Sequence, residues 1–518
     1  MPLPLPEYDR LDATDLARLV RAGEVSPEEL AEAALARAEA RGEPLGAFTH
    51  VERPEAVIAQ ATSALDGPFR GVPFPVKDLM HAVAGMPMRS GSEAFRHFVP
   101  EADSTLVGRY RAAGLVFVGK TSVPEFGLMG VTEPQAYGPA RNPWAPERSP
   151  GGSSGGAGAA VAARIAPAAS ASDGGGSIRI PASFGGVFGL KPSRGRVPEG
   201  PFVGESWHGA AASLAITRTV RDAAALLDVA AGPSPGDPVA LARPATPFAD
   251  EVGRAPGRLR IGFTATSPLG TPVDPACVRA VTEAAALLER LGHDVEEAAP
   301  EVDGRAIARG YLTLYFGQVA AAVRRSEEIV PGARQRVEPA TRLLAQIGES
   351  LSAGQYVTLL DGWNDLGRAV GRFHERYDLY LTPTAAALPP EVGAQDPTAT
   401  ERLLMQVAIA ARAGGLLLKT GFVDRLVDER LAATPFTQLA NLAGLPAMSV
   451  PMLWTDPGPG APRGLPVGVQ VVARPAEEAV LLRLAAQIEA ERPWADREPA
   501  LVETAAVPEA ETVPASEA

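Results

Sequence analysis

Two glycine-rich stretches dominate the middle of this sequence. Residues 149–160 read SPGGSSGGAGAA, and residues 172–192 read SDGGGSIRIPASFGGVFGLKP. Each stretch places a serine, Ser153 or Ser177, among glycines that let the backbone turn tightly. After three glycines, several backbone N–H groups can converge on one point, which is the arrangement that stabilises an oxyanion. Ser177 is therefore a candidate nucleophile, although a glycine-rich turn around a buried serine explains the same residues equally well.

A serine hydroxyl is a weak nucleophile and needs a base. None of the six histidines has the local sequence of a catalytic triad, and the Gly-x-Ser-x-Gly pattern is absent around Ser177. Lys77 follows the apolar run Val-Pro-Phe-Pro-Val and is the alternative base. The ordinary pKa of lysine is about 10.4, so burial must lower it before Lys77 can act near pH 7. Taken alone, a lysine in this setting is more often a surface lysine than a catalytic base.

A second hydroxyl group can connect the lysine to the nucleophile, because a hydroxyl accepts and donates a proton at once. Ser153 and its neighbour Ser154 are both available for this role. The carboxylate of Asp78 would raise the pKa of Lys77 if the two side chains faced each other. We therefore expect Asp78 to point elsewhere.

Composition sets further limits on the chain. The 518 residues are 46% hydrophobic and 21% charged, which is enough for a large folded core. The net charge of −13 argues against nucleic-acid binding. The single cysteine, Cys277, permits no intrachain disulfide, fits a reducing compartment and is expected to be a half-buried helical thiol. With no signal peptide and no apolar run of about 20 residues, we expect a cytoplasmic protein without a membrane partner.

Strands alternate with helices along the chain, which predicts an α/β architecture with a central sheet. We expect one domain over residues 1–495, with a catalytic core at about 65–230, a mostly helical region at about 305–430 that forms the substrate pocket, and an acidic, disordered tail at 496–518. Residues 127–152 are expected to form loops. Helices are predicted at 12–40, 103–113, 157–165, 219–231, 275–291 and 477–489. Strands are predicted at 71–76, 115–118, 259–263, 379–382 and 467–472.

Residues 114–121, Gly-Leu-Val-Phe-Val-Gly-Lys-Thr, match the spacing of a nucleotide-binding P-loop. That motif needs a glycine-rich loop leading directly into a helix. Here the four middle residues favour a strand, and Pro124 disfavours an immediate helix. We therefore expect Lys120 and Thr121 to follow a buried strand, and we keep nucleotide binding only as an alternative.

The run from Gly151 to Pro192 closely resembles the amidase signature family, whose members use a Ser–Ser–Lys triad. The resemblance implies an amidase signature fold, in which helices cover both faces of a large mixed sheet. It implies that Ser177 is the nucleophile, Ser153 the bridging serine after a cis Gly152–Ser153 peptide bond, and Lys77 the base. It also implies an oxyanion hole and two partners that support its loop. The oxyanion hole would be made by Gly174, Gly175, Gly176 and Ser177, and the partners would be Asp173 and Arg179.

The resemblance covers about residues 10–495 and is strongest toward the 6-aminohexanoate cyclic-dimer hydrolases, notably at 132–144. Two positions depart from it. Gly174 stands where the family has a larger residue, and Tyr315 stands where those hydrolases carry a smaller one. The candidate substrate-binding residues are Gly127, Met129, Ser154 and Tyr315.

The predicted function is hydrolysis of carboxylic amides through an acyl-enzyme, with neither metal nor cofactor. We expect aryl amides, alkyl amides or short amide oligomers as substrates, with esters and carbamates (urethanes) open because the same attack serves them. The sequence also leaves open whether the protein forms a homodimer. The alternatives are the glutaminase subunit of a tRNA-dependent amidotransferase and a catalytically inactive interaction protein.

Overall fold

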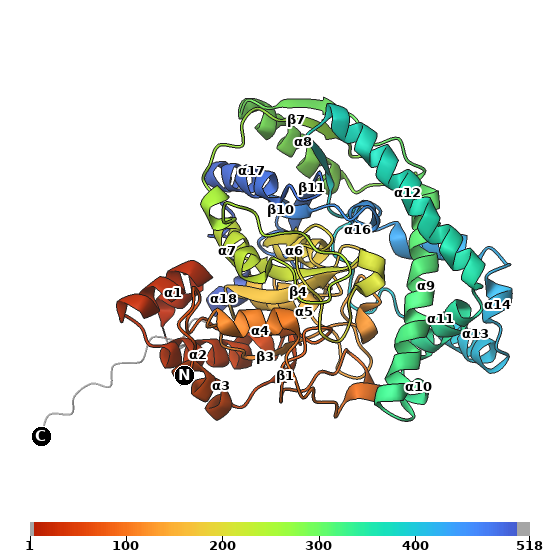
Figure 1. The fold of residues 1–518 in the computed structure, drawn as a ribbon, viewed down its shortest axis with the longest axis horizontal. Helices are drawn as coiled ribbons and strands as arrows, with labels where there is room; N and C mark the ends of the chain where they lie inside the picture. The colour runs from red at the N-terminus through yellow and green to blue at the C-terminus, as the bar shows by residue number, and fades with distance from the viewer. Residues whose placement is uncertain (1–4, 505–518) are drawn as a thin grey trace, which may run out of the picture.

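The computed structural model describes residues 5–504, and its centre is a mixed eight-stranded sheet (Figure 1). The strand order is β4-β6-β5-β10-β11-β9-β7-β8. Neighbouring strands are antiparallel from β4 to β9, and β9, β7 and β8 are parallel. The strands are β4 (Ala168–Asp173), β5 (Phe188–Lys191), β6 (Ala212–Thr217), β7 (Arg260–Phe263), β8 (Asp294–Glu297), β9 (Leu379–Pro383), β10 (Ala447–Trp454) and β11 (Pro466–Ala473).

Helices cover both faces of this sheet, which confirms the predicted α/β class. On one face, α5 (Gly155–Ala162) and α6 (Arg179–Gly185) contact each other and the strands that carry the glycine-rich loops. The other face is covered by α7 (Val220–Ala230), α8 (Pro275–Arg290) and α17 (Glu478–Glu491). The small residues of α5 allow a very close approach, since a Cβ on Gly156 would lie 2.3 Å from the Ser122 nitrogen.

A second, three-stranded sheet brings Lys77 to the site. It consists of β1 (Phe48–Val51), β3 (Gly119–Thr121) and β2 (Val76–Lys77), in that order. The predicted strands at 71–76 and 115–118 are placed too early, because regular pairing begins only at β2 and β3. Pro73 and Pro75 lack the N–H donors that a longer ladder needs, and only an isolated bridge joins Pro73 to Val116.

The N-terminal region is largely helical. The predicted helices appear as α1 (Ala13–Ala22), α2 (Pro27–Arg37) and α4 (Thr105–Ala112), whereas α3 (Pro54–Thr62) was not predicted. The side chain of Asp12 caps α1, and Ser26 with Glu29 forms a capping box on α2.

A layer of long and short helices lies along one side of the molecule in Figure 1. Their buried aromatic and aliphatic side chains, among them Phe316 and Ile347, form a hydrophobic cluster separate from the core beneath the sheet. The short α16 (Gln438–Leu442) then leads into β10. The layer is made of α9 (Gly304–Ile329), α10 (Ala333–Arg336), α11 (Pro339–Glu349), α12 (Ala353–Arg376), α13 (Ala399–Ala410), α14 (Gly414–Leu417) and α15 (Phe422–Leu426).

The C-terminal end of the described chain is ordered further than predicted. Residues 500–504 form α18 (Ala500–Thr504), and Val502 is buried at 4% exposure. The predicted tail therefore begins too early at residue 496, and its last part, 505–518, lies outside the described residues. Cys277 lies on α8 and is buried more deeply than expected, at 2% exposure. Within residues 5–504, every helix is too short or too polar to cross a membrane.

Candidate active site

Lys77 ends β2 inside the protein, with its side-chain nitrogen surrounded by hydroxyl groups. The nitrogen Nζ lies 2.9 Å from Ser153 Oγ, 2.8 Å from Ser154 Oγ and 2.9 Å from Ser172 Oγ. It also donates to the Ser172 carbonyl oxygen at 3.2 Å. Burial lowers the pKa of Lys77 to about 7, and the nearby charge of Asp173 opposes this shift. A substantial fraction of this lysine is therefore neutral at physiological pH.

Asp78 points away from Lys77, as expected. Its carboxylate accepts the Arg89 N–H at 2.7 Å and the Thr49 hydroxyl at 2.8 Å. Burial raises the pKa of Asp78 to about 6, although the Lys120 charge opposes this rise.

Ser153 precedes α5 and has a cis peptide bond before it, between Gly152 and Ser153. Its hydroxyl group is a hydrogen-bond partner of Lys77 and also reaches the cavity described below. Thr132 braces the chain here, since its hydroxyl donates to the Gly151 carbonyl at 2.8 Å and accepts the Gly155 N–H at 3.2 Å.

Ser177 lies on the loop between β4 and α6. It is half-buried and faces the same cavity as Ser153. Among residues 5–504, its hydroxyl makes no hydrogen bond, and the backbone N–H groups of Gly174, Gly175 and Ser177 donate to no protein group. The N–H of Gly176 is already occupied, because it donates to the Asp173 carboxylate at 2.7 Å.

A buried ion pair anchors this loop. Arg179 donates two hydrogen bonds to Asp173, each of 2.9 Å, and neither side chain is exposed. Burial alone would raise the pKa of Asp173, but the charge and hydrogen bonds of Arg179, the charge of Lys191 and the hydrogen bond of Asn441 together outweigh it, so the pKa lies well below its usual range. The guanidinium group also reaches Asn441 and Gln470, which ties the loop to α16 and β11. Asp173 and Arg179 thus occupy the supporting positions that the sequence analysis predicted.

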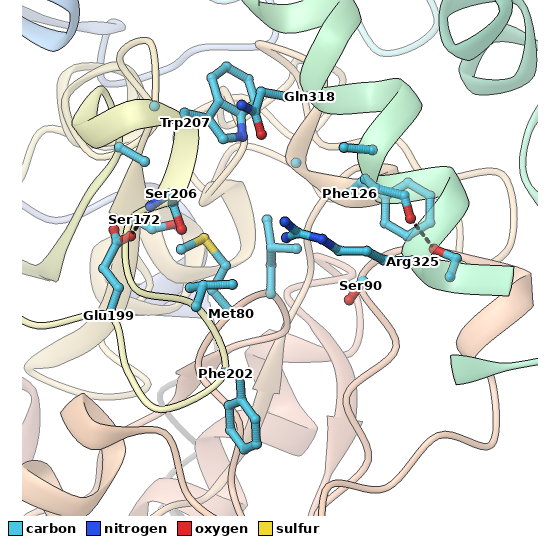
Figure 2. Close-up of a pocket in the computed structure, with 18 of the residues that line it drawn as sticks. Met80, Ser90, Phe126, Ser172, Glu199, Phe202, Ser206, Trp207, Gln318 and Arg325 are labelled. Carbon is cyan, nitrogen blue, oxygen red and sulfur yellow. Dashed lines mark hydrogen bonds between the residues drawn. The ribbon is translucent and has the colours of Figure 1, made fainter. Parts of the chain in front are cut away.

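A cavity of 1200 Å³ opens above these serines (Figure 2). Of the four candidate substrate-binding residues, only Gly127 belongs to its lining. Ser154 is fully buried against Lys77, and Met129 lies outside the lining. Tyr315 is buried, and its hydroxyl donates to the Leu128 carbonyl at 2.9 Å instead of facing the cavity. The aromatic side chains that do line the cavity are Phe95, Phe98, Phe126, Phe202, Trp207, Tyr311 and Tyr356.

Sequence reasoning missed Ser172 and Tyr311. Alternation along β4 was a usable signal for Ser172, because residues two apart in a strand share a face. Ser170 and Ser172 both turn toward Lys77, where Ser170 Oγ accepts the Lys77 backbone N–H at 2.8 Å. Tyr311 lies one helical turn before Tyr315 on α9. The sequence analysis therefore identified the helix that lines the cavity but named a tyrosine on the wrong turn of that helix.

The P-loop match at residues 114–121 does not form a phosphate-binding loop. Its end is the strand β3 rather than the start of a helix. Lys120 is fully buried, and its side-chain nitrogen donates to the His81 carbonyl at 2.6 Å. The part of the chain that the structure describes also contains no cluster of side chains suited to hold a metal ion.

Known proteins resemble this chain over nearly its whole length. The Amidase family model matches residues 29–482. The 6-aminohexanoate-cyclic-dimer hydrolase of Pseudomonas sp. (strain NK87) is 38% identical over 501 residues, covering 95% of this chain and 97% of that protein. A solved structure of 6-aminohexanoate cyclic dimer hydrolase complexed with substrate superposes with a TM-score of 0.85 at 35% identity, covering 95% of this chain and 99% of the other.

A second solved structure, of one subunit of the glutamyl-tRNA(Gln) amidotransferase from Thermotoga maritima, gives a TM-score of 0.73 at 28% identity, covering 94% of this chain and 96% of the other. The chain belongs to the amidase signature family. It is an amide-hydrolysing enzyme, similar over nearly its whole length to a 6-aminohexanoate-cyclic-dimer hydrolase.

Proposed function

We propose that this enzyme cleaves small carboxylic amides through an acyl-enzyme on Ser177, with Ser153 and Lys77 as its proton relay. The observation that carries the proposal is the 2.9 Å contact between Lys77 Nζ and Ser153 Oγ, because the lysine is fully buried and the serine reaches the cavity. A neutral amine hydrogen-bonded to a hydroxyl group can serve as a general base.

The proposed reaction has two halves. Lys77 takes a proton from Ser153 while Ser153 takes one from Ser177, and Ser177 Oγ attacks the amide carbonyl. The N–H groups of Gly174, Gly175 and Ser177 have no acceptor among residues 5–504 and are the proposed donors to the oxyanion. The proton returns through Ser153 to the leaving nitrogen, the C–N bond breaks, and water then releases the acid from Ser177.

The cavity supports aryl amides, alkyl amides and short amide oligomers as substrates, because its aromatic lining favours apolar chains. Esters and aryl carbamates are proposed as further substrates, since the same attack on a carbonyl group cleaves them. The similarity to part of an amidotransferase makes glutamine the informative polar comparison.

The test is release of acid and amine from anilides, alkyl amides, aminohexanoate oligomers, aryl carbamates and glutamine. Turnover should disappear in Ser177→Ala and fall by several orders of magnitude in Lys77→Ala. Full activity of Lys77→Ala would rule out this base. Turnover of glutamine alone would favour the glutaminase of a tRNA-dependent amidotransferase. If a fluorophosphonate probe does not label Ser177 and no substrate is turned over, the alternative of a catalytically inactive interaction protein is favoured.

A further inference from the structure

The cavity carries opposite charges on different parts of its wall. Figure 2 shows the Arg325 side chain extending from α9 into the cavity, with Glu199 on the opposite side of the view. Glu205, from the same segment after β5 as Glu199, also belongs to the lining, and so does Glu101. The proposed acyl transfer uses none of these charged side chains.

Arg325 has no partner within residues 5–504, where it makes neither an ion pair nor a hydrogen bond. Two other arginines of α9 are paired, since Arg305 contacts Asp428 and Arg309 contacts Asp424. The neighbouring Arg324 is exposed and, within residues 5–504, also makes no ion pair, but it lies outside the cavity lining. A guanidinium group presents a planar set of donors that matches a carboxylate. The free donors of Arg325 therefore provide a receptor for a negatively charged end of a ligand.

Glu199 is suited to bind a positively charged end of a ligand. One carboxylate oxygen accepts the Ser206 N–H, while the other, Oε1, is shielded from solvent without a donor among the described residues. Burial raises the pKa of Glu199 to about 7, and its hydrogen bonds with Ser206 oppose this rise. A buried carboxylate oxygen without a donor is costly, and a ligand ammonium group would satisfy it.

The rest of the cavity lining is mostly apolar and includes Phe126, Trp207 and Tyr311. We propose that the site selects acyclic, zwitterionic amides, with a terminal carboxylate bound by Arg325 and a terminal ammonium facing Glu199. An open-chain dimer of an ω-amino acid has this form, whereas a cyclic dimer has no charged end. This inference rests on the proposed function, because it concerns the substrate of the same site.

The experiment compares the open-chain dimer of 6-aminohexanoate with two capped forms, its C-terminal carboxamide and its N-acetyl derivative. The wild-type enzyme should show a KM about tenfold lower for the dimer than for either capped form, the equivalent of one charge-assisted hydrogen bond. Arg325→Ala should abolish the preference for the free carboxylate but keep the preference for the free amine. Glu199→Gln, which retains an acceptor for Ser206, should do the reverse.

Arg324→Ala is the matched control, because Arg324 is exposed on the same helix, lies outside the cavity lining and carries the same charge. Arg324→Ala should keep both preferences. If Arg324→Ala and Arg325→Ala lose the preference for the free carboxylate equally, the effect comes from the net charge of the protein and not from a contact with Arg325, which would overturn the inference. The inference is overturned if the wild-type enzyme shows no preference for free ends, or if Arg325→Ala retains the preference for the free carboxylate.

Hydrolysis of a neutral anilide separates this inference from the proposed function. Cleavage of the anilide without any preference for charged ends would overturn the inference alone. If no amide is cleaved, the proposed function fails, but the role of Arg325 can still be tested by calorimetry. The affinity of the Ser177→Ala variant for 6-acetamidohexanoate should be about tenfold higher than that of the Ser177→Ala/Arg325→Ala double variant. Equal affinities of the two variants would overturn the role of Arg325.

Discussion

Lys77 Nζ lies as close to the Ser172 hydroxyl oxygen as to that of Ser153, at 2.9 Å in both cases. Ser154 approaches the same nitrogen to 2.8 Å. The lysine is therefore held by three hydroxyl groups, of which Ser153 and Ser172 reach the cavity. Only Ser153 is proposed to pass a proton, so the three serines should differ in their kinetic effect.

Alanine at Ser172 or Ser154 should lower kcat by about tenfold, because each change removes one hydrogen bond that positions Lys77. Ser153→Ala should be far more damaging, since it interrupts the proton relay. Single-turnover kinetics with a chromogenic anilide would measure the three effects. Equal losses for all three variants would contradict a special role for Ser153.

The pH dependence of activity should report the ionisation of Lys77. Because the pKa of Lys77 is lowered to about 7, kcat/KM should rise as the pH passes through about 7 and then level off. A pH profile measured with a neutral amide tests this. An acid limb centred near pH 4 would point to a carboxylate as the base instead.

The same ionisation predicts how stability responds to pH. Between about pH 7 and the ordinary pKa of lysine, the unfolded chain holds a proton that native Lys77 lacks, so stability rises with pH in this window. Below about pH 7 the native protein carries the full cost of a buried charge. Lys77→Met should therefore stabilise the protein more at pH 6 than at pH 9 relative to the wild type, as measured by urea unfolding. A difference that does not change with pH would contradict the prediction.

Breaking the Asp173–Arg179 pair should destabilise the protein. Asp173→Asn leaves a fully buried guanidinium group without its counter-charge, and such changes cost about 3–5 kcal/mol. Urea unfolding would measure the loss. Asp294→Asn, which breaks the exposed pair with Arg258, is the control and should change the unfolding free energy far less, because water screens that pair. Similar losses in both variants would contradict the anchoring role of Asp173.

Gly175 should tolerate no side chain. A Cβ at this position would lie 2.1 Å from the Tyr311 hydroxyl oxygen. Gly175→Ala should displace the nucleophile loop and reduce kcat about a hundredfold, the usual cost of a shift near 1 Å. Adding Tyr311→Ala should restore part of the activity by removing the obstructing ring. Gly362→Ala meets no neighbour within 4 Å and provides the control for glycine replacement in general.

Tyr315→Phe should affect stability rather than substrate binding. It removes the hydrogen bond to the Leu128 carbonyl, which is worth about 1 kcal/mol. Thermal unfolding should show the loss, while KM for a neutral anilide stays close to the wild-type value. A large rise in KM would return Tyr315 to the substrate-binding residues that the sequence analysis named.

Much of the fold could be predicted from local sequence patterns. The helices at 219–231 and 275–291 and the strands at 379–382 and 467–472 appear within a residue or two of the expected bounds, because amphipathic or apolar periodicity determines them. Strand β6 was missed because Ala212–Thr217 pairs on both sides and is buried throughout, so no alternation marks it.

The site was predicted unevenly for a similar reason. Ser153 and Ser177 belong to the long motif from Gly151 to Pro192, and Lys77 follows an apolar run upstream of it. The structure brings Lys77 and Ser153 into contact. Pocket residues such as Tyr311 depend on how α9 lies against the glycine-rich loop, which is a tertiary contact without a local pattern. Arg325 was missed for the same reason, since an exposed arginine on a long helix ordinarily faces solvent.

The anchoring of Arg179 has a consequence for how the enzyme is made. A ribosome has delivered Lys77, Ser153 and Ser177 long before it adds Thr437, Asn441 and Gln470, which complete the hydrogen bonds of Arg179. A truncated chain that ends before these residues contains the three proposed reacting groups but not the hydrogen bonds that support their loop. We therefore expect such a chain to be inactive although it carries the whole proposed triad.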